Sequence, residues 1–355
     1  MPTLFDPLKL GALTLPNRIV LAPLTRSRAH PDSRVPSDLA VEYYRQRAGA
    51  GLILSEATSI TPMGVGYAGT PGIWSGEQTE GWKKVTEAVH GAGGRMMLQL
   101  WHVGRISDPI FLNGATPVSA SAIRLKGHVA LVRPEKEFVK PRALTIEEIP
   151  GVIAAYRKGA ENAKAAGFDG VEIHGANGYL LDQFLQDSTN HREDAYGGSR
   201  EKRARLMLEV ADAVAEVWGA ERVGMHLAPR MDSNDMGDSD ALATFTYVGR
   251  ELGKRGLAFL CAREAQKPDS IGPTIKEAFG GVFIANEGFT QEGAELALAE
   301  GKADAVAFGK LFLANPDLPD RFARHAPLNA WDVKTFYSGG AAGYTDYPAL
   351  RTEPA

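Results

Sequence analysis

Residues 146–174, IEEIPGVIAAYRKGAENAKAAGFDGVEIH, contain the repeating unit from which the fold can be predicted. Apolar residues recur at helical spacing from Ile146 to Ala166, and Gly167 accepts the left-handed conformation that ends many helices. Gly170–His174 is then a short apolar run typical of a buried strand. A helix followed closely by a strand is therefore the unit to look for in the rest of the chain.

Strands of this kind are predicted eight times along the chain. They are Arg18–Ala22, Gly51–Thr58, Arg95–His102, Gly170–His174, Arg222–Leu227, Leu257–Ala262, Gly281–Ala285 and Ala303–Phe308. Most are continuous apolar runs, as expected for parallel strands that are covered on both faces.

Helical patterns fill the intervals between these strands. The predicted helices are Asp38–Ala50, Glu77–Ala92, Ile146–Ala166, Arg200–Trp218 and Ala241–Arg255. Two of them begin near a capping box, formed by Ser75 with Gln78 and by Thr145 with Glu148, in which each side chain satisfies a free N–H at the other end.

Eight units in which strand and helix alternate favour a closed (β/α)8 barrel over an open sheet. An open sheet of this class needs a glycine-rich phosphate loop after its first strand, and residues 23–29, PLTRSRA, contain no glycine. We therefore predict an α/β TIM barrel that occupies residues 1–355 as a single domain. Residues 4–18 predict an N-terminal β-hairpin across the floor of the barrel.

Three long segments follow predicted strands at their C-terminal ends, where barrel enzymes keep their active sites. The largest is the insertion 103–144 after the third strand, and the others are residues 178–199 and 229–240. A barrel uses roughly 250 residues, so these loops and the hairpin account for most of the remainder. We expect the loops to form walls and lids over a substrate site.

Composition excludes several classes of protein and partner. Of the residues, 44% are hydrophobic and 23% are charged, with a net charge of −4 and both signs mixed, so a nucleic-acid partner is not expected. No apolar run is long enough to span a membrane, and the start has no signal-peptide pattern, which predicts a cytoplasmic protein without a membrane partner. The single cysteine, Cys261, and the scattered histidines predict no disulfide, iron–sulfur cluster or other metal site. We expect a monomer or a homodimer.

Polar side chains stand at or just after the ends of the predicted strands, where functional residues of a barrel are expected. They are Thr25, Glu56, Gln99, Trp101, His174, Asn177, Tyr179 and His226. His174 and Asn177 can aim two neutral donors at one carbonyl or enolate oxygen, and Tyr179 can supply a proton. The alternative is that His174 and Asn177 only tie their loop together.

Glycines after the last two predicted strands indicate a phosphate site. Gly288 and Gly309 each precede a predicted helix start, and Lys310 adds a positive charge. Barrels often bind phosphate with these two loops, so we expect a ligand that carries a phosphate group.

Several motifs together resemble the Old Yellow Enzyme family across essentially the whole chain. They include NRIVLAPLTRSRA at residues 17–29, GFDGVEIHGANGYLLDQFLQDSTNHREDAYGGS at 167–199 and GYTDYP at 343–348. The resemblance implies an oxidoreductase that binds FMN tightly without a covalent bond, accepts hydride from NADPH or NADH, and reduces electron-poor alkenes in a ping-pong reaction.

The resemblance also assigns roles to individual residues. His174 and Asn177 would bind the carbonyl or nitro oxygen of the substrate, Tyr179 would protonate its α-carbon, and Trp101 and Tyr337 would shape the pocket. The FMN would be held by Pro23, Leu24, Thr25, Ala57, Gln99, His226, Gly288, Phe308, Gly309 and Lys310.

Two residues depart from the pattern of the family. His226 and Lys310 stand where the family usually has arginine. A titratable imidazole in place of a permanent cation predicts that reduction of the flavin depends more strongly on pH. The alternative is that a neutral His226 only donates a hydrogen bond to the edge of the flavin ring. Lysine keeps the charge but loses the two-pronged hydrogen bonding of arginine.

Two other functions compete with the ene-reductase. One is a barrel enzyme without redox chemistry that acts on a phosphate-bearing ligand, such as an isomerase or an aldolase. That class normally needs a catalytic lysine or carboxylate base at a strand end, which the sequence does not clearly offer. The other is a flavin-binding protein without catalysis, against which the set His174, Asn177 and Tyr179 argues.

Overall fold

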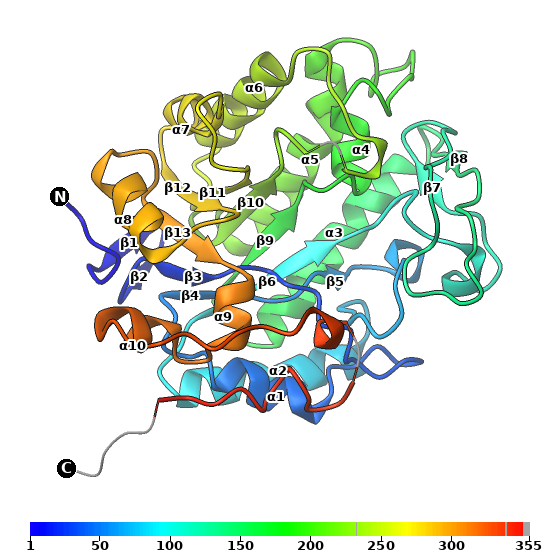
Figure 1. The fold of residues 1–355 in the computed structure, drawn as a ribbon. Helices are drawn as coiled ribbons and strands as arrows, with labels where there is room; N and C mark the ends of the chain where they lie inside the picture. The colour runs from blue at the N-terminus through cyan, green and yellow to red at the C-terminus, as the bar shows by residue number, and fades with distance from the viewer. Residues whose placement is uncertain (232, 338, 351–355) are drawn as a thin grey trace.

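A closed ring of eight parallel strands forms the centre of the described residues, 1–231, 233–337 and 339–350, in this computed structural model (Figure 1). The strands are β3 (Ile19–Leu21), β4 (Leu52–Leu54), β6 (Met96–Trp101), β9 (Gly170–His174), β10 (Val223–Leu227), β11 (Phe259–Arg263), β12 (Val282–Asn286) and β13 (Ala305–Phe308). Pairing of β13 with β3 closes the ring. The predicted barrel and its eight strands are confirmed.

One predicted strand is interrupted. Residues 51–58 form β4 and the two-residue β5 (Thr58–Ser59), and both pair in parallel with β6. The residues between them leave the regular pleat, which places Glu56 and Ala57 in a buried bend at the end of the strand.

Helices surround the strands on the outside of the ring (Figure 1). They are α1 (Asp38–Arg45), α2 (Gly76–Gly91), α3 (Ile149–Ala165), α4 (Leu180–Leu185), α5 (Arg200–Trp218), α6 (Ala241–Lys254), α7 (Gly272–Phe279), α8 (Gln291–Ala299), α9 (Lys310–Ala314) and α10 (Leu318–Ala323). The predicted bounds of α5 are confirmed, and so is the capping box of Ser75 and Gln78 at the start of α2.

The prediction for the start of α3 is wrong by three residues. The helix begins at Ile149, and Pro150 lies in its first turn, where a missing N–H costs nothing. A start at Ile146 would have set the proline ring against the carbonyl of Ile146 itself. Glu148 accepts a hydrogen bond from the backbone N–H of Thr145 at 2.8 Å, but Thr145 caps no helical N–H, so the predicted box is only half formed.

An antiparallel hairpin covers the floor of the barrel, as predicted. It consists of β1 (Leu8–Leu10) and β2 (Leu13–Leu15), and its leucines pack with Phe259 and Cys261 in one buried cluster. Gly11 at the tip has a φ of +53°, and a Cβ there would lie 2.0 Å from the backbone oxygen of Glu221. Glycine is therefore required for the hairpin to reach the floor.

The three long loops meet above the opposite end of the barrel. The insertion 103–144 contains a short parallel pair, β7 (Val118–Ser119) with β8 (Arg142–Ala143). Arg105 in this insertion donates to the backbone oxygen of Asn234 at 2.8 Å, and Asn234 Nδ2 donates to that of Asn177 at 2.9 Å. The loops after β6, β9 and β10 are thus joined by hydrogen bonds.

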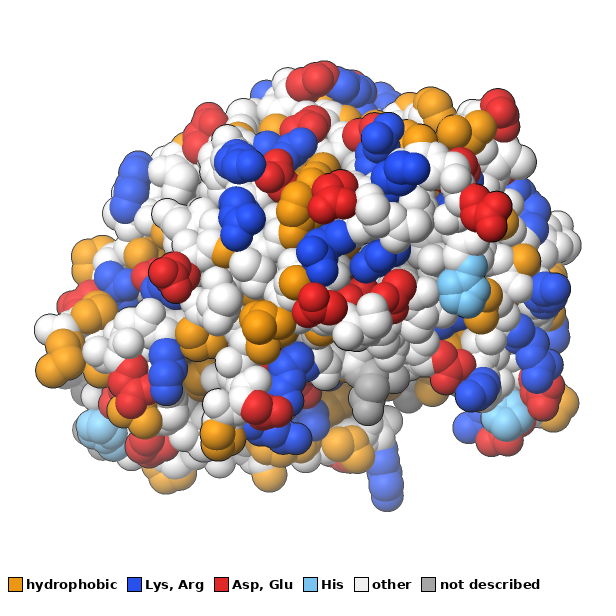
Figure 2. All heavy atoms as spheres, turned by 90° about the horizontal axis from the view of Figure 1, so that it is seen from above, with side chains coloured by type: hydrophobic (Ala, Val, Ile, Leu, Met, Phe, Trp, Pro, Cys, Tyr) orange, Lys and Arg blue, Asp and Glu red, His pale blue; other side chains and the backbone are white. Residues whose placement is uncertain are grey.

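Charged side chains of both signs are interspersed on the face shown in Figure 2. Charged side chains of the protein are also paired between neighbouring helices, as Arg255 is with Asp212 at 2.7 Å. The basic start of α5 is paired as well, because Arg200 lies 3.2 Å from Asp240. Among the described residues, no helix has both the length and the apolar composition needed to cross a bilayer.

Candidate functional site

The rings of Trp101, His174 and Tyr179 come together at the C-terminal end of the barrel. Trp101 ends β6 and His174 ends β9. The ring centroid of Tyr179 lies 4.9 Å from that of Trp101 and 4.9 Å from that of His174. The structure therefore brings three of the predicted site residues into one cluster.

A sharp turn after β9 positions Asn177 and Tyr179. Asn177 has a φ of +58° and Gly178 a φ of +78°, the left-handed region that asparagine and glycine tolerate best. The buried carboxyl group of Asp182 accepts a hydrogen bond from the backbone N–H of Gly178 at 2.9 Å and another from Gln186 Nε2 at 2.7 Å. Asp182 thus stabilises the turn through its hydrogen bond with Gly178.

Ionisation of Asp182 is expected to make the fold less stable at higher pH. Burial raises the pKa of Asp182 from 3.8 to about 7, so the folded state keeps a proton that the unfolded chain has already lost. The stabilisation is full below the unfolded pKa and is lost as the pH rises through the folded one. Between about pH 5 and about pH 8 we expect the free energy of unfolding to fall by about 3 kcal/mol through this group.

Urea unfolding of the wild type and of Asp182→Asn, each at the lower and at the higher pH, measures how much of the change in the free energy of unfolding comes from Asp182. The variant stays uncharged, so its free energy of unfolding should depend less on pH. The pKa of the buried Glu56 is also raised to about 7, but Glu56 is present in both proteins and its contribution cancels. Equal pH dependence in the two proteins would contradict the assignment to Asp182.

His174 is poised as a neutral hydrogen-bond donor. Burial, together with the nearby His226 and Arg263, holds the pKa of His174 well below its ordinary value, so the ring is uncharged at neutral pH. Its Nδ1 lies 3.3 Å from the backbone nitrogen of Ala176 and accepts that N–H. The ring proton therefore sits on Nε2, which leaves Nε2–H to donate to a ligand.

The amide of Asn177 contacts a cation. Arg263, the last residue of β11, donates from Nη1 to Asn177 Oδ1 at 3.2 Å. Since a guanidinium only donates, the amide oxygen must face it. Asn177 Nδ2 is then left to act as the second donor of the site.

Tyr179 is held as a protonated phenol. Its hydroxyl lies 3.1 Å from that of Tyr67, and the Tyr67 ring stacks on Trp101 at a centroid distance of 5.6 Å. Burial raises the pKa of Tyr179 well above its ordinary value, and Tyr67 and Tyr337 raise it further. The hydroxyl therefore keeps its proton at neutral pH and can act as an acid.

The side chain of Glu172 lies next to two more of the predicted site residues, Gln99 and His226. Glu172 Oε2 accepts from Gln99 Nε2 at 2.7 Å, and its Oε1 lies 3.3 Å from His226 Nδ1. His226 is opposite His174 in the β9–β10 register, and their ring centroids are 5.9 Å apart. Gln99 and His226 thus lie within the barrel mouth, on the side of His174.

The residues predicted to hold a phosphate lie on neighbouring loops. Strands β12 and β13 pair directly, and Asn286 Nδ2 donates to the backbone oxygen of Ala307 at 2.9 Å. Gly288 and Lys310 are exposed just beyond the strand ends, and Gly288 has a φ of +76°. The loops after the last two strands are therefore adjacent and open.

The predicted flavin-lining residues that follow β3 and β4 reach the same end of the barrel. Pro23, Leu24 and Thr25 are half-buried, and a Cβ on Gly309 would lie 3.6 Å from the Leu24 side chain. Ala57 is buried in one cluster with Trp101 and with Leu125, Val129 and Phe138 of the insertion 103–144. The insertion thus packs against the site residues.

One predicted cofactor residue faces away from the loops. The ring of Phe308 packs edge-on against Phe322 of α10, with centroids 5.3 Å apart. A contact between Phe308 and a cofactor would therefore come from its backbone.

The C-terminal segment brings Tyr337 to the mouth of the barrel. Arg26, next to Thr25, donates to the backbone oxygens of Phe336 at 3.2 Å and of Gly343 at 2.7 Å. The side chain of Tyr337 remains 49% exposed. Tyr337 also raises the pKa of Tyr67 and of Tyr179. Tyr337 is thus an outer wall of the site, open to solvent.

Comparison with known proteins decides the family. The model of the NADH:flavin oxidoreductase / NADH oxidase family matches residues 3–329. This chain belongs to that family, the Old Yellow Enzyme family. A structure of morphinone reductase in complex with tetrahydroNAD has 49% identity and a TM-score of 0.95, covering 99% of this chain and 98% of the other.

Two other relatives agree with this assignment. The Old Yellow Enzyme homologue of Zymomonas mobilis has 44% identity and a TM-score of 0.96, covering 98% of this chain and 100% of the other. The 12-oxophytodienoate reductase 2 of Arabidopsis thaliana is 43% identical, covering 98% of this chain and 96% of its own length. Membership of the Old Yellow Enzyme family makes the chain an alkene reductase with FMN as cofactor and NAD(P)H as reductant. The isomerase or aldolase alternative is therefore wrong.

The residues present fit the flavin that the Old Yellow Enzyme family uses. His226 is buried, and its Nε2 has no hydrogen-bond partner among the described residues. A buried polar atom of this kind requires a partner, which the polar edge of a bound cofactor can supply. The open Gly288 and Lys310 loops suit its phosphate.

A possible metal-ligand set also lies in the barrel interior. Donor atoms of Glu172, His226 and Cys261 lie within 4.8 Å of one another, and all three residues are buried. The sequence did not suggest this group, because its members come from three strands, at spacings that match no metal motif. Burial raises the pKa of the Cys261 thiol well above its ordinary value, so the thiol stays protonated.

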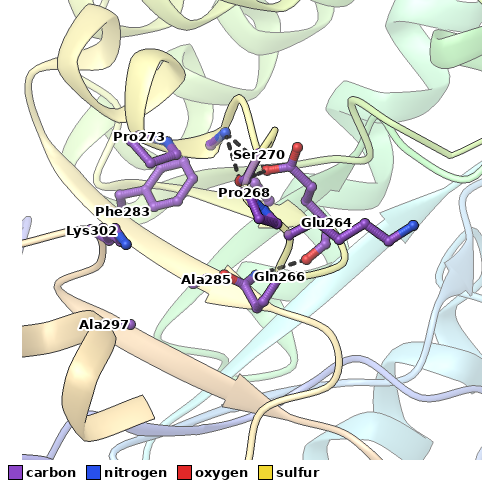
Figure 3. Close-up of a pocket in the computed structure, with 12 residues that line it drawn as sticks. Glu264, Gln266, Pro268, Ser270, Pro273, Phe283, Ala285, Ala297 and Lys302 are labelled. Atoms are coloured by element: carbon purple, nitrogen blue, oxygen red, sulfur yellow. Dashed lines mark hydrogen bonds between the residues drawn. The ribbon is translucent and has the colours of Figure 1, made fainter. Parts of the chain in front are cut away.

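A separate cavity of about 410 Å³ lies outside the ring, against α7 and α8 (Figure 3). It is lined by Phe283, Ala285, Ala297 and Lys302 among others and contains none of the predicted site residues. Its one carboxylate, Glu264, accepts from the backbone N–H groups of Ile271 and Gly272 at 2.9 Å each. Because Glu264 is engaged at the start of α7, it serves the fold there.

Sequence reasoning missed two residues of the site. Tyr67 lies in a loop after β5 and carries no local signal of its role. Arg263 could have been found, because it directly follows the predicted sixth strand, and the rule used for the other site residues applies to that position.

Proposed function

We propose that this protein reduces the C=C bond of α,β-unsaturated carbonyl and nitro compounds. The observation that carries the proposal is the presence of two oriented neutral donors, His174 and Asn177, beside the protonated Tyr179. When bound, FMN supplies the redox chemistry, which is the transfer of hydride from NAD(P)H to the alkene in a ping-pong sequence.

In this proposal the donors activate the substrate. His174 Nε2–H and Asn177 Nδ2–H donate to the carbonyl or nitro oxygen and draw electrons from the double bond. Negative charge grows on that oxygen as hydride reaches the β-carbon, so fixed donors in a buried site stabilise the transition state more than the substrate. Neutral donors also avoid burying a net charge beside Arg263.

Tyr179 completes the addition by giving its proton to the α-carbon. Its raised pKa keeps the phenol protonated until the substrate carries negative charge. The hydroxyl of Tyr67, 3.1 Å away, can then hydrogen-bond the phenolate and pass its proton to Tyr179, while Tyr67 regains a proton from water. Trp101 and Tyr337 wall the pocket, and the insertion 103–144 determines which alkenes fit.

The cofactor contacts in this proposal follow the ends of the strands. Gly288, Gly309 and Lys310 hold the phosphate, while the other contacts come from the residues after β3, β4, β6 and β10. These are Pro23, Leu24, Thr25, Ala57, Gln99 and His226, with Phe308 contributing its backbone. The single-domain organisation, the monomeric or dimeric state and the cytoplasmic location stay predictions.

The proposal is tested by the colour of the purified protein. Flavin absorbance should bleach under anaerobic conditions when NADPH is added and should return on addition of 2-cyclohexen-1-one. Failure to bleach would exclude the nicotinamide half of the reaction. Bleaching without recovery would instead favour flavin binding without alkene reduction.

His226 is proposed to make the flavin potential depend more strongly on pH. The groups that face it are Glu172 and His174 on β9 and Cys261 on β11. His174 is neutral and the thiol of Cys261 stays protonated, so neither of these two groups places a charge beside His226. Midpoint potentials of the wild type and His226→Arg, measured from about pH 6 to about pH 8, should show a steeper slope in the wild type. Equal slopes would refute the proposal.

A further inference from the structure

We propose that Arg263 is a positioning residue that sets the orientation of the Asn177 amide, an inference that rests on the proposed function. Arg263 ends β11 and Asn177 lies in the turn after β9, two elements that do not pair directly. Their contact therefore crosses the mouth of the barrel, above β10. It joins a residue without an assigned role to one of the two substrate donors.

The contact decides which side of the amide faces the substrate. Arg263 Nη1 donates to Asn177 Oδ1 at 3.2 Å, and among the described residues Asn177 Nδ2 donates no hydrogen bond. The terminal torsion of asparagine is broad and has two nearly equivalent orientations. The opposite orientation would turn Nδ2 toward the cation and Oδ1 toward the oxygen of the substrate, which are two unfavourable contacts.

The backbone of Asn177 is fixed independently of Arg263. Its φ is +58°, and its carbonyl oxygen accepts from Asn234 Nδ2 at 2.9 Å. With the backbone held in this way, the rotation of the amide about its terminal torsion decides which of its atoms faces the substrate, and Arg263 favours one orientation.

Arg263 is itself held by a two-pronged ion pair. Its Nε lies 2.8 Å from Glu287 Oε2, and its Nη2 lies 3.3 Å from Glu287 Oε1. The planar fork fixes the guanidinium and leaves Nη1 to donate to Asn177, with the sulfur of Met231 as a second contact at 3.7 Å. Glu287 follows β12 and precedes Gly288. Arg263 therefore connects Asn177 to the loop that is proposed to bind phosphate.

A double-mutant cycle tests whether Arg263 acts through Asn177. The four proteins are the wild type, Arg263→Met, Asn177→Gly and the double variant. Glycine removes the amide and tolerates the positive φ. For 2-cyclohexen-1-one we expect Arg263→Met to lower kcat/KM about ten-fold in the wild type and less than about two-fold in Asn177→Gly. In a ping-pong reaction, kcat/KM for the enone reports only its own half-reaction.

The same double-mutant cycle can be measured by ligand binding, without any turnover. Titration calorimetry of the flavin-loaded proteins with cyclohexanone, a saturated ketone that cannot be reduced at C=C, should show the same coupling in Kd. If the wild type binds cyclohexanone but reduces no enone, the proposed function fails while the binding cycle still decides the role of Arg263.

Two further variants separate positioning from a general effect on the fold. Glu287→Gln weakens the ion pair that holds Arg263. It should lower kcat/KM by about three-fold, again only when Asn177 is present. Arg255→Met removes an arginine paired with Asp212 on the outer helices, away from the site, and should leave kcat/KM unchanged. Equal losses in the presence and absence of Asn177, or no loss in Arg263→Met, would overturn the inference.

Discussion

Replacing His174 with alanine is expected to lower kcat/KM for enone reduction about 100-fold. The imidazole is buried, neutral and fixed in the tautomer that donates from Nε2, because Nδ1 already accepts from Ala176. The donor therefore needs no reorganisation when charge develops on the substrate oxygen. Alanine leaves Asn177 as the only one of the two proposed donors, and steady-state rates at several enone concentrations would measure the loss.

The comparison needs a control for the loss of a histidine and for the loss of cofactor. His90→Ala removes a half-exposed imidazole that contacts Asp169 on the outside of the barrel, so its rates should match the wild type. Flavin absorbance relative to protein absorbance shows whether each variant keeps its cofactor. His174→Asn restores an N–H donor and should recover part of the activity. Wild-type rates in a flavin-loaded His174→Ala would remove His174 from the mechanism.

The barrel could be predicted from sequence because its signal is local. Parallel strands covered on both faces are continuous apolar runs, and each is separated from the next by helical periodicity. The start of α3 was misplaced because Thr145 and Glu148 match a capping box, whereas Pro150 decides where the helix begins. A proline four residues after a proposed start outweighs the motif.

The site could be predicted only in part. The end of a strand can be recognised from a few neighbouring residues, whereas a contact between two loops joins residues that are far apart in the sequence. His174, Gln99 and His226 lie on strands, so their convergence followed from the barrel itself. Tyr67 contacts Tyr179 from a loop that is 112 positions away in the sequence. No periodicity encodes that contact, which depends on how the loop after β5 packs on Trp101.

Replacing Tyr179 with phenylalanine is expected to slow alkene reduction about 100-fold and to leave reduction of the flavin by NADPH within about two-fold of the wild type. Phenylalanine keeps the ring that packs at 4.9 Å against both Trp101 and His174, so the pocket should hold its shape. It removes the hydroxyl that is proposed to deliver the proton. Nicotinamide oxidation requires no such proton, so the two half-reactions should separate.

Rapid mixing of each half-reaction under anaerobic conditions measures this separation. Because burial raises the pKa of Tyr179 and lowers that of His174, neither group should titrate near neutrality. Titration of Tyr179 or His174 should therefore add no pH dependence to the alkene half-reaction between about pH 6 and about pH 9. Tyr156→Phe is the matched control, since its buried hydroxyl has no hydrogen-bond partner among the described residues and lies in the α3 core. If Tyr179→Phe slowed both half-reactions equally, the hydroxyl would be shaping the pocket, and the proton would come from another donor such as water.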